Sequence, residues 1–145
     1  MPLIQFHLVE GEYSDEQLRT LLERGSAAYA EVLESPVDRI RAFVTLHAAA
    51  HWAIGGQPDE PAGRRSPYFS AVMMAERPAD QRRRALAVMT DLVVEVLGVE
   101  RNRVRGSINR VAAEDWAIGG VPASVIRAAE VEQRKAASGA GVAAS

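Results

Sequence analysis

A pentapeptide that occurs twice constrains the fold of this chain more than any other feature of its sequence. WAIGG stands at Trp52–Gly56 and again at Trp116–Gly120, an offset of 64 residues, and it holds both tryptophans of the 145-residue chain. When 36–56 is placed on 100–120 without a gap, nine of the 21 positions are identical. Self-similarity at a fixed offset indicates a duplicated structural unit. The chain is therefore expected to consist of two similar units in tandem.

Each unit reads as a strand, a helix and a second strand. An apolar run of strand length begins each unit. Ser14 and Gln17 form a capping-box pattern, which predicts the start of a helix between the strands. The four expected strands are Leu3–Val9, Arg39–Leu46, Tyr68–Ala75 and Arg103–Val111.

Two βαβ units predict an α/β (α+β) fold with a four-stranded sheet and two helices on one face. The other face is expected to be apolar and covered by further subunits, which predicts a homotrimer with six βαβ units around a pseudo-sixfold axis. A short helix over Val121–Lys135 and a flexible low-complexity tail are expected at the end. The expected boundaries are one domain over 1–120, its repeats 1–56 and 66–120, the linker 57–65, and the C-terminal segment 121–145.

Composition excludes several classes of function. The formal net charge is −2 and no basic face is evident, so no nucleic-acid partner is expected. There is no cysteine, which excludes disulfides and thiolate chemistry. With neither a membrane-spanning run nor a signal-peptide pattern, we expect a cytoplasmic protein without a membrane partner. His47 and His51 have metal-ligand spacing but fall at a strand end and a loop without an acid, so neither a metal nor a cofactor is expected.

Three features together resemble the tautomerase superfamily: a proline directly after Met1, βαβ units of this length, and an aromatic-x-Ile-Gly-Gly end. PLIQFHLVEGEYSDEQ is similar to the start of a 4-oxalocrotonate tautomerase subunit, and HWAIGG is similar to its end. The fused length and the Ala-Glu-Asp-Trp at Ala113–Trp116 resemble the malonate semialdehyde decarboxylase branch. The resemblance covers about 1–120. It implies a tautomerase/MIF-like fold and cofactor-independent chemistry on a small carboxylate.

Pro2 is the candidate general base. After removal of Met1 it would present a secondary amine, and an α-amino group has a pKa of about 8. Burial and nearby arginines disfavour the charged form and lower that pKa, so the neutral amine can accept a proton near pH 7. Its copy in the second unit, Pro67, lies inside the chain, and its amide nitrogen is not basic. We therefore expect one amine-based site per chain.

The resemblance also implies roles for arginines. The family arginine that follows the first strand is replaced by Glu12 in the first unit and is present as Arg77 in the second. The family arginine eleven residues before the terminal aromatic is kept in both units, as Arg41 and Arg105. Guanidinium groups bind carboxylates in two-point fashion and stabilise developing enolate charge. The alternative for Arg41 and Arg105 is an exposed strand charge or an ion pair between subunits.

Three further residues are candidates through the same resemblance. Trp52 and Trp116 match the aromatic residue that walls the substrate site; interface packing is the alternative for whichever copy lies far from the base. Asp38 matches an aspartate of the decarboxylase branch and is Asn102 in the second unit; a solvated turn residue is its alternative. That branch also carries Arg-Pro-Arg, where this sequence has Arg77–Ala79 as Arg-Pro-Ala.

Three functions remain open. The leading one is a keto–enol tautomerase in which Pro2 moves a proton on a small 2-oxo or 2-hydroxy acid. Arg77 holds the carboxylate, and Arg41 or Arg105 polarises the carbonyl oxygen. The second is a hydratase-decarboxylase or dehalogenase-like lyase, with protonated Pro2 as acid and Asp38 positioning water. The third is a non-catalytic trimer that keeps the scaffold for binding.

Overall fold

The computed structural model describes residues 2–143, with side chains described up to residue 139. Met1, on whose removal a Pro2 amine depends, and the last two residues of the expected tail lie outside the described residues. The described chain forms two compact units, which do not correspond to the two sequence repeats. The larger comprises the residues up to Met73 together with Arg77–Arg110, and the smaller comprises Met74–Glu76 together with the chain from Val111 onward.

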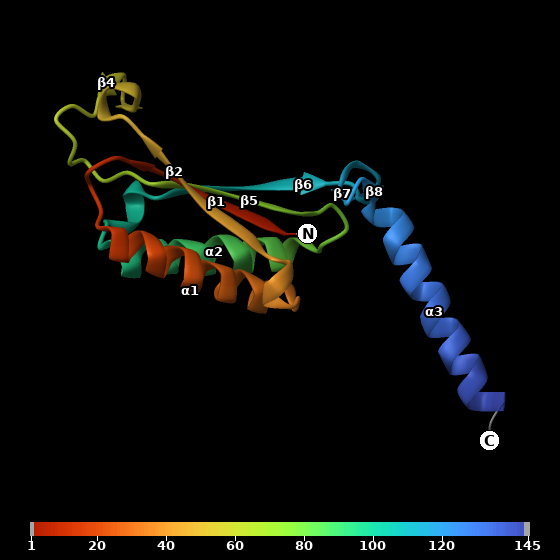
Figure 1. The fold of residues 1–145 in the computed structure, drawn as a ribbon. Coiled ribbons are helices and arrows are strands. Elements are labelled where there is room, and N and C mark those ends of the chain that lie inside the picture. The colour runs from red at the N-terminus through yellow and green to blue at the C-terminus, as the bar shows by residue number, and fades with distance from the viewer. Residues whose placement is uncertain (1, 144–145) are drawn as a thin grey trace. The chain divides into compact units, whose positions relative to one another are not determined.

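A mixed four-stranded sheet organises the fold. Its strands are β1 (Leu3–Val9), β2 (Arg41–His47), β5 (Tyr68–Met74) and β6 (Arg105–Val111). They lie in the order β2-β1-β5-β6 (Figure 1). β1 and β2 are parallel, with Leu3 opposite Arg41, whereas β1 and β5 are antiparallel, with Leu3 opposite Val72. Pro67 is hydrogen-bonded to Arg105, and the next residue, Tyr68, is hydrogen-bonded to Ser107. Residue numbers therefore increase in the same direction along β5 and β6, so these two strands are parallel.

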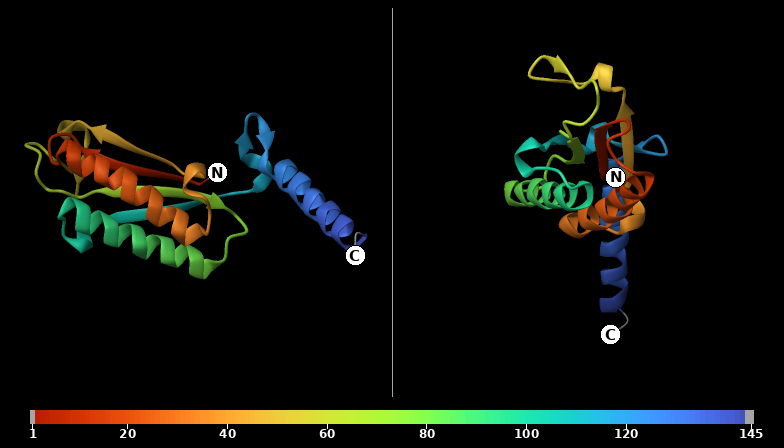
Figure 2. Two further views of the ribbon diagram at one scale, coloured as in Figure 1. Left: turned by 60° about the horizontal axis from the view of Figure 1, so that its bottom comes forward. Right: turned by 90° about the vertical axis from the view of Figure 1, so that its left-hand side faces the viewer.

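Two helices, α1 (Asp15–Leu33) and α2 (Ala79–Leu97), lie side by side on one face of the sheet (Figures 1 and 2). The predicted capping box starts α1. The Ser14 Oγ accepts a hydrogen bond from the Gln17 backbone N–H at 3.1 Å, and the Gln17 side chain accepts one from the Ser14 N–H at 2.9 Å. The predicted fold, a four-stranded sheet with two helices on one face, is confirmed.

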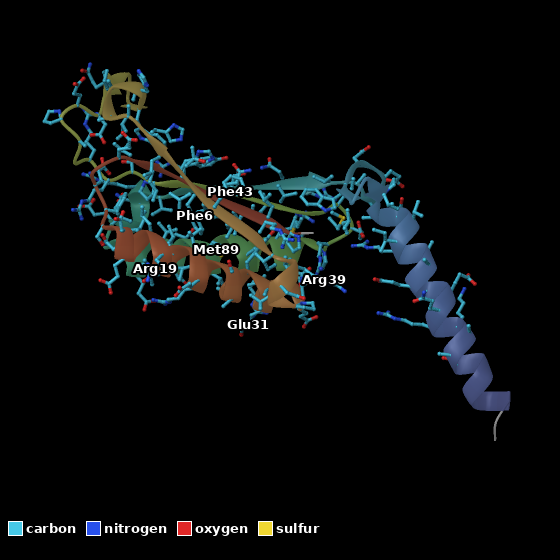
Figure 3. The ribbon with its side chains drawn as sticks, viewed as in Figure 1. Phe6, Arg19, Glu31, Arg39, Phe43 and Met89 are labelled. Carbon is cyan, nitrogen blue, oxygen red and sulfur yellow. The ribbon has the colours of Figure 1, made fainter. Side chains whose placement is uncertain are left out.

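The hydrophobic core fills the space between the sheet and the helices. Phe6 of β1 and Met89 of α2 are almost completely buried there, whereas Phe43 lies on the opposite face and is 40% exposed (Figure 3). Tyr29 of α1 is also buried, and its hydroxyl donates to the carbonyl of Val72 at 2.7 Å. Complete burial of a large apolar side chain contributes about 2–3 kcal/mol, so this layer is what holds the helices on the sheet.

The two repeats fill an equivalent core position with different pairs of side chains. In the first repeat Ile4 of β1 lies opposite Ala42 of β2. In the second repeat Phe69 of β5 packs against Gly106 of β6, and a Cβ at Gly106 would lie 2.1 Å from Cζ of Phe69. The larger side chain on one strand thus occupies the space that the smaller residue leaves on the next.

The sheet face away from the helices differs from expectation. The prediction of an apolar face is correct only in part: Phe43 lies on this face, but polar side chains also cross it in hydrogen-bonded pairs. The pairs are His7 with His47 at 3.0 Å, Tyr68 with Ser107 at 2.6 Å, and Ser70 with Asn109 at 2.7 Å. Reading each strand as one apolar run ignored the alternation of side chains between the two faces.

Each WAIGG forms a small hairpin. In both copies the Gly-Gly pair occupies the turn with positive φ, at 60° and 80° for Gly55 and Gly56 and at 58° and 83° for Gly119 and Gly120. Two consecutive positive φ values define the turn type that strongly favours glycine. The hairpin strands are β3 (Ala53–Ile54) with β4 (Gln57–Pro58), and β7 (Ala117–Ile118) with β8 (Val121–Pro122).

Short 3-10 turns precede the sheet strands β2 and β6 and each hairpin. As a result, β2 and β6 begin at Arg41 and Arg105, two residues later than predicted. The turns are η1 (Val37–Arg39), η2 (Ala49–His51), η3 (Arg101–Arg103) and η4 (Ala113–Asp115).

The smaller unit contains a third helix, α3 (Ala123–Ala143). It is longer than the helix predicted over Val121–Lys135 and extends into the segment that was expected to be a flexible tail. Within this unit Arg127 forms an ion pair with Glu76. Among the residues described, no helix is both long enough and apolar enough to span a membrane.

The pair formed by Phe69 and Gly106 gives a stability prediction. Gly106→Ala should lower the free energy of unfolding by about 1–3 kcal/mol, because the new Cβ overlaps the Phe69 ring. The double variant Phe69→Ile/Gly106→Ala copies the pair of the first repeat and should recover most of the loss. Urea unfolding of the three proteins measures this. A double variant less stable than Gly106→Ala alone would contradict the proposed exchange of volume.

Candidate functional site

Pro2 is buried at one end of the sheet, immediately before β1. Its carbonyl accepts a hydrogen bond from the backbone N–H of Arg41 at 3.1 Å. The exposed Arg41 side chain donates from Nη1 to the carbonyls of Asp38 at 3.1 Å and Ile40 at 3.3 Å. Parallel pairing of β1 and β2 therefore brings the candidate base, one candidate arginine and the turn that carries Asp38 to the same place.

Arg77 belongs to this same end of the sheet. Because β5 runs antiparallel to β1, the residues that follow β5 lie beside the start of β1. Nη1 of Arg77 donates to the carbonyl of Leu33, the last residue of α1, at 2.7 Å. Burial raises the pKa of Tyr29, and the positive charge of Arg77 opposes that rise.

The second repeat builds the same backbone arrangement at the opposite end. The carbonyl of Pro67 accepts a hydrogen bond from the Arg105 N–H at 3.1 Å. Nη1 of Arg105 donates to the carbonyls of Asn102 at 2.6 Å and Val104 at 3.2 Å. Within one chain, Arg41 therefore lies beside Pro2 and Arg105 lies beside Pro67.

A cavity of about 690 Å³ opens at the Pro67 end. Its lining includes Trp52, Arg64, Pro67, Tyr68, Arg103 and Arg105. Trp52 thus belongs to the cavity of the internal proline. Trp116 is half-buried in the smaller unit, and its role as a wall of the substrate site stays a prediction.

A buried carboxyl pair is a feature that sequence reasoning missed. Glu12, after β1, is 7% exposed, and Asp59, in the linker, is 1% exposed. Glu12 Oε1 accepts a hydrogen bond from the Gly63 N–H at 3.1 Å, and Asp59 Oδ1 accepts one from the Arg64 N–H at 3.3 Å. Burial, with a hydrogen bond to Asp59, raises the pKa of Glu12 to about 7. The expected exposed linker is therefore anchored at its centre by two acids.

The surroundings of this pair are only partly polar. The hydroxyl of Tyr13 and Oδ2 of Asp59 are buried, and no hydrogen-bond partner is present for either among the described residues. Arg65 lies over the Tyr13 ring, with Cζ 5.8 Å from the ring centroid. A proton on Glu12, whose pKa is raised, reduces the cost of placing the two acids there, since two adjacent carboxylates repel each other.

The histidines form a second cluster. His7 Nδ1 and His47 Nε2 are 3.0 Å apart, and the His7 ring stacks on Tyr68 at 5.6 Å between centroids. The His47 ring lies 5.1 Å from that of Trp52. Burial, followed by the proximity of His47, lowers the pKa of His7. His51 is exposed in η2, and the described residues contain no cluster of three metal-binding side chains.

Comparison with known proteins agrees with this geometry. The family model described as Tautomerase enzyme matches residues 2–59 and 71–126, one segment in each repeat. The 2-hydroxymuconate tautomerase of Pseudomonas sp. (strain CF600) is 40% identical over 58 residues, which are 40% of this chain and 90% of that protein. The same enzyme of Stutzerimonas stutzeri is 38% identical over 64 residues, 44% of this chain and 100% of that protein. The chain belongs to the tautomerase family, as its motifs predicted.

Solved structures show the same fold over most of the chain. A native fused 4-OT superposes with a TM-score of 0.79 at 24% identity, covering 85% of this chain and 97% of that one. The F6 fused 4-OT asymmetric trimer gives a TM-score of 0.78 at 21% identity, covering 86% and 98%. N1, a member of the cis-3-chloroacrylic acid dehalogenase family, gives 0.74 at 16% identity, covering 83% and 82%.

The buried pair predicts a pH-dependent stability. The Glu12 pKa is about 7 in the folded chain against 4.5 ordinarily, so the folded state retains a proton that the unfolded state loses as the pH rises. Wild-type stability should therefore fall between about pH 5 and pH 7, by at most about 3 kcal/mol. Glu12→Gln cannot ionise and should lack this component.

Unfolding of both proteins in urea at several pH values measures the difference. The lowered pKa of His7 acts in the opposite direction, because its stabilising effect is lost as the pH falls, but it is common to both proteins and cancels. A constant difference between pH 5 and pH 8 would contradict a proton bound at Glu12.

Proposed function

We propose that this chain is a cofactor-independent keto–enol tautomerase that acts on a small 2-oxo or 2-hydroxy carboxylic acid, with the amine of Pro2 as general base. The observation that carries the proposal is the grouping of Pro2, Arg41 and Arg77 at one end of the sheet. Such a site offers one base and two guanidinium groups. The 2-hydroxymuconate tautomerases among the relatives support an unsaturated dicarboxylic acid as the substrate class.

The proposed reaction moves one proton and one double bond. With Met1 removed, the neutral Pro2 amine takes a proton from the enol oxygen or from a carbon next to the carbonyl. It returns the proton at another carbon as the electron pair of the double bond shifts. With Met1 removed, burial of Pro2 and the positive charges nearby would favour the neutral form of its amine. Arg77 holds the carboxylate, and Arg41 stabilises the negative charge that develops on the oxygen.

The chain is proposed to act as a homotrimer. Strands β2 and β6 are both sheet edges, and unpaired edges need cover. Related fused 4-OT structures are trimers, which supports the same assembly here. In a trimer a neighbouring chain could supply Trp116 to a Pro2 site. Sedimentation equilibrium that gives a folded monomer would exclude the trimer.

A lyase is the second candidate. Asp38 lies in the turn whose carbonyl binds Arg41, so an acid that could position water is present at the Pro2 end. The dehalogenase-family structure with the same fold is consistent with such chemistry. Assays with 2-hydroxymuconate, phenylenolpyruvate and malonate semialdehyde separate the two activities. A protein that retains Met1 and turns over none of them would be the non-catalytic trimer.

Pro2→Ala should keep a primary amine in place of the secondary one. We expect kcat/KM for the best tautomerase substrate to fall by about ten- to a thousandfold, because the rigid, less solvated base is lost. A protein that keeps Met1 should be inactive, because the nitrogen is then an amide. Mass spectrometry of each assayed sample establishes its N-terminus. Equal turnover by the processed and Met1-retaining forms would exclude Pro2 as the base.

Arg77→Ala should raise KM by about ten- to a hundredfold, because loss of one charge-assisted contact costs about 1.5–3 kcal/mol. The variant also loses the hydrogen bond to the Leu33 carbonyl, so its melting temperature is measured alongside. Arg84→Ala, at an exposed arginine of α2, is the matched control. If the two variants have the same KM, Arg77 does not bind the carboxylate, and Arg41 becomes the candidate for that contact.

A further inference from the structure

We propose that the cavity at Pro67 is a second, non-catalytic binding site for a small planar carboxylate. The cavity measures about 690 Å³, which is within the range of small-molecule sites. Side chains of the first hairpin, the linker, β5 and the turn before β6 line it. The inference does not depend on an amine at Pro2, because Pro67, not Pro2, lines this cavity.

The charge around the cavity favours an anion. Three guanidinium groups line it. Arg64 lies 3.8 Å from the carboxylate of Asp59, and Arg103 lies 3.2 Å from that of Glu100. Arg105 binds two backbone carbonyls through Nη1, and no carboxylate pairs with it in the described part of the chain. One oriented guanidinium therefore remains to bind a carboxylate.

The apolar part of the lining favours a flat ligand. Trp52 and Tyr68 present aromatic rings to the cavity. Both rings have neighbours that restrict them, since the His47 ring lies 5.1 Å from that of Trp52 and the Tyr68 hydroxyl is hydrogen-bonded to Ser107 at 2.6 Å. Fixed aromatic rings bind conjugated or aromatic groups by stacking at little entropic cost.

The pattern of divergence between the repeats explains why this site would bind without turnover. The first repeat has Pro2 and Asp38, which could exchange a proton with a ligand. At the equivalent places the second repeat has Pro67, whose nitrogen is an amide, and Asn102, which does not titrate. The arginine is retained as Arg105. The groups that could move a proton are lost, and the group that would hold a carboxylate remains.

The test uses the full chain with Trp116→Phe, so that Trp52 is the one fluorescent indole. The probe is trans-cinnamate, a planar carboxylate without a carbonyl to enolise. Saturable quenching of Trp52 is expected. Arg105→Gln should weaken cinnamate binding at least tenfold, whereas Arg41→Gln, the matched change in the other repeat, should alter it less than twofold. Cinnamamide lacks the negative charge and acetate lacks the planar aromatic group, so each should bind at least tenfold more weakly than cinnamate.

A second variant guards against misfolding of Arg105→Gln. Asn102→Asp keeps every arginine and adds a negative charge at the cavity wall, so it should weaken cinnamate at least threefold. Thermal melts establish that each variant is folded. The proposal is overturned if folded Trp116→Phe protein shows no saturable quenching at millimolar cinnamate, or if Arg41→Gln and Arg105→Gln weaken binding equally. Failure of the tautomerase proposal would appear instead as absent turnover by the wild-type chain, with quenching intact in the Trp116→Phe protein.

Discussion

The antiparallel pairing of β1 with β5 is the constraint on which the site depends. It joins two parallel βαβ units into one sheet, and it sets the start of each unit's first strand beside the end of the other's. Residues that follow one strand are thereby delivered to the proline that precedes the other. Arg77 comes to the Pro2 end in this way, and Glu12 comes to the Pro67 end. Each end of the sheet therefore combines a proline from one repeat with a residue from the other repeat.

Most of the fold could be predicted from the sequence because its signals are local. The 64-residue offset, the capping box at Ser14 and the Gly-Gly turns each depend on a few neighbouring residues. The assignment of Arg41 to Pro2 and of Arg105 to Pro67 depends on which strands pair. The sequence reading of two adjacent βαβ units did not settle that pairing.

The linker shows a different limit of sequence reasoning. Glu12 and Asp59 are acids in loops rich in turn residues, and such residues are almost always exposed. Their burial follows from a tertiary contact between distant segments, which composition does not reveal. The polar side chains on the outer sheet face were missed for a simpler reason. The polar residues His7, Ser70 and Asn109 alternate with the apolar residues that face the helices.

The exchange of volume between Ile4 with Ala42 and Phe69 with Gly106 has a consequence for the history of the chain. Duplicated gene segments are prone to recombine with each other. A recombinant that carried only the first strand of one repeat into the other would set a phenylalanine against Ala42 or an isoleucine against Gly106. One product is overpacked and the other contains a void, and either is destabilised. The packing of each repeat therefore disfavours exchange of this one strand between the repeats.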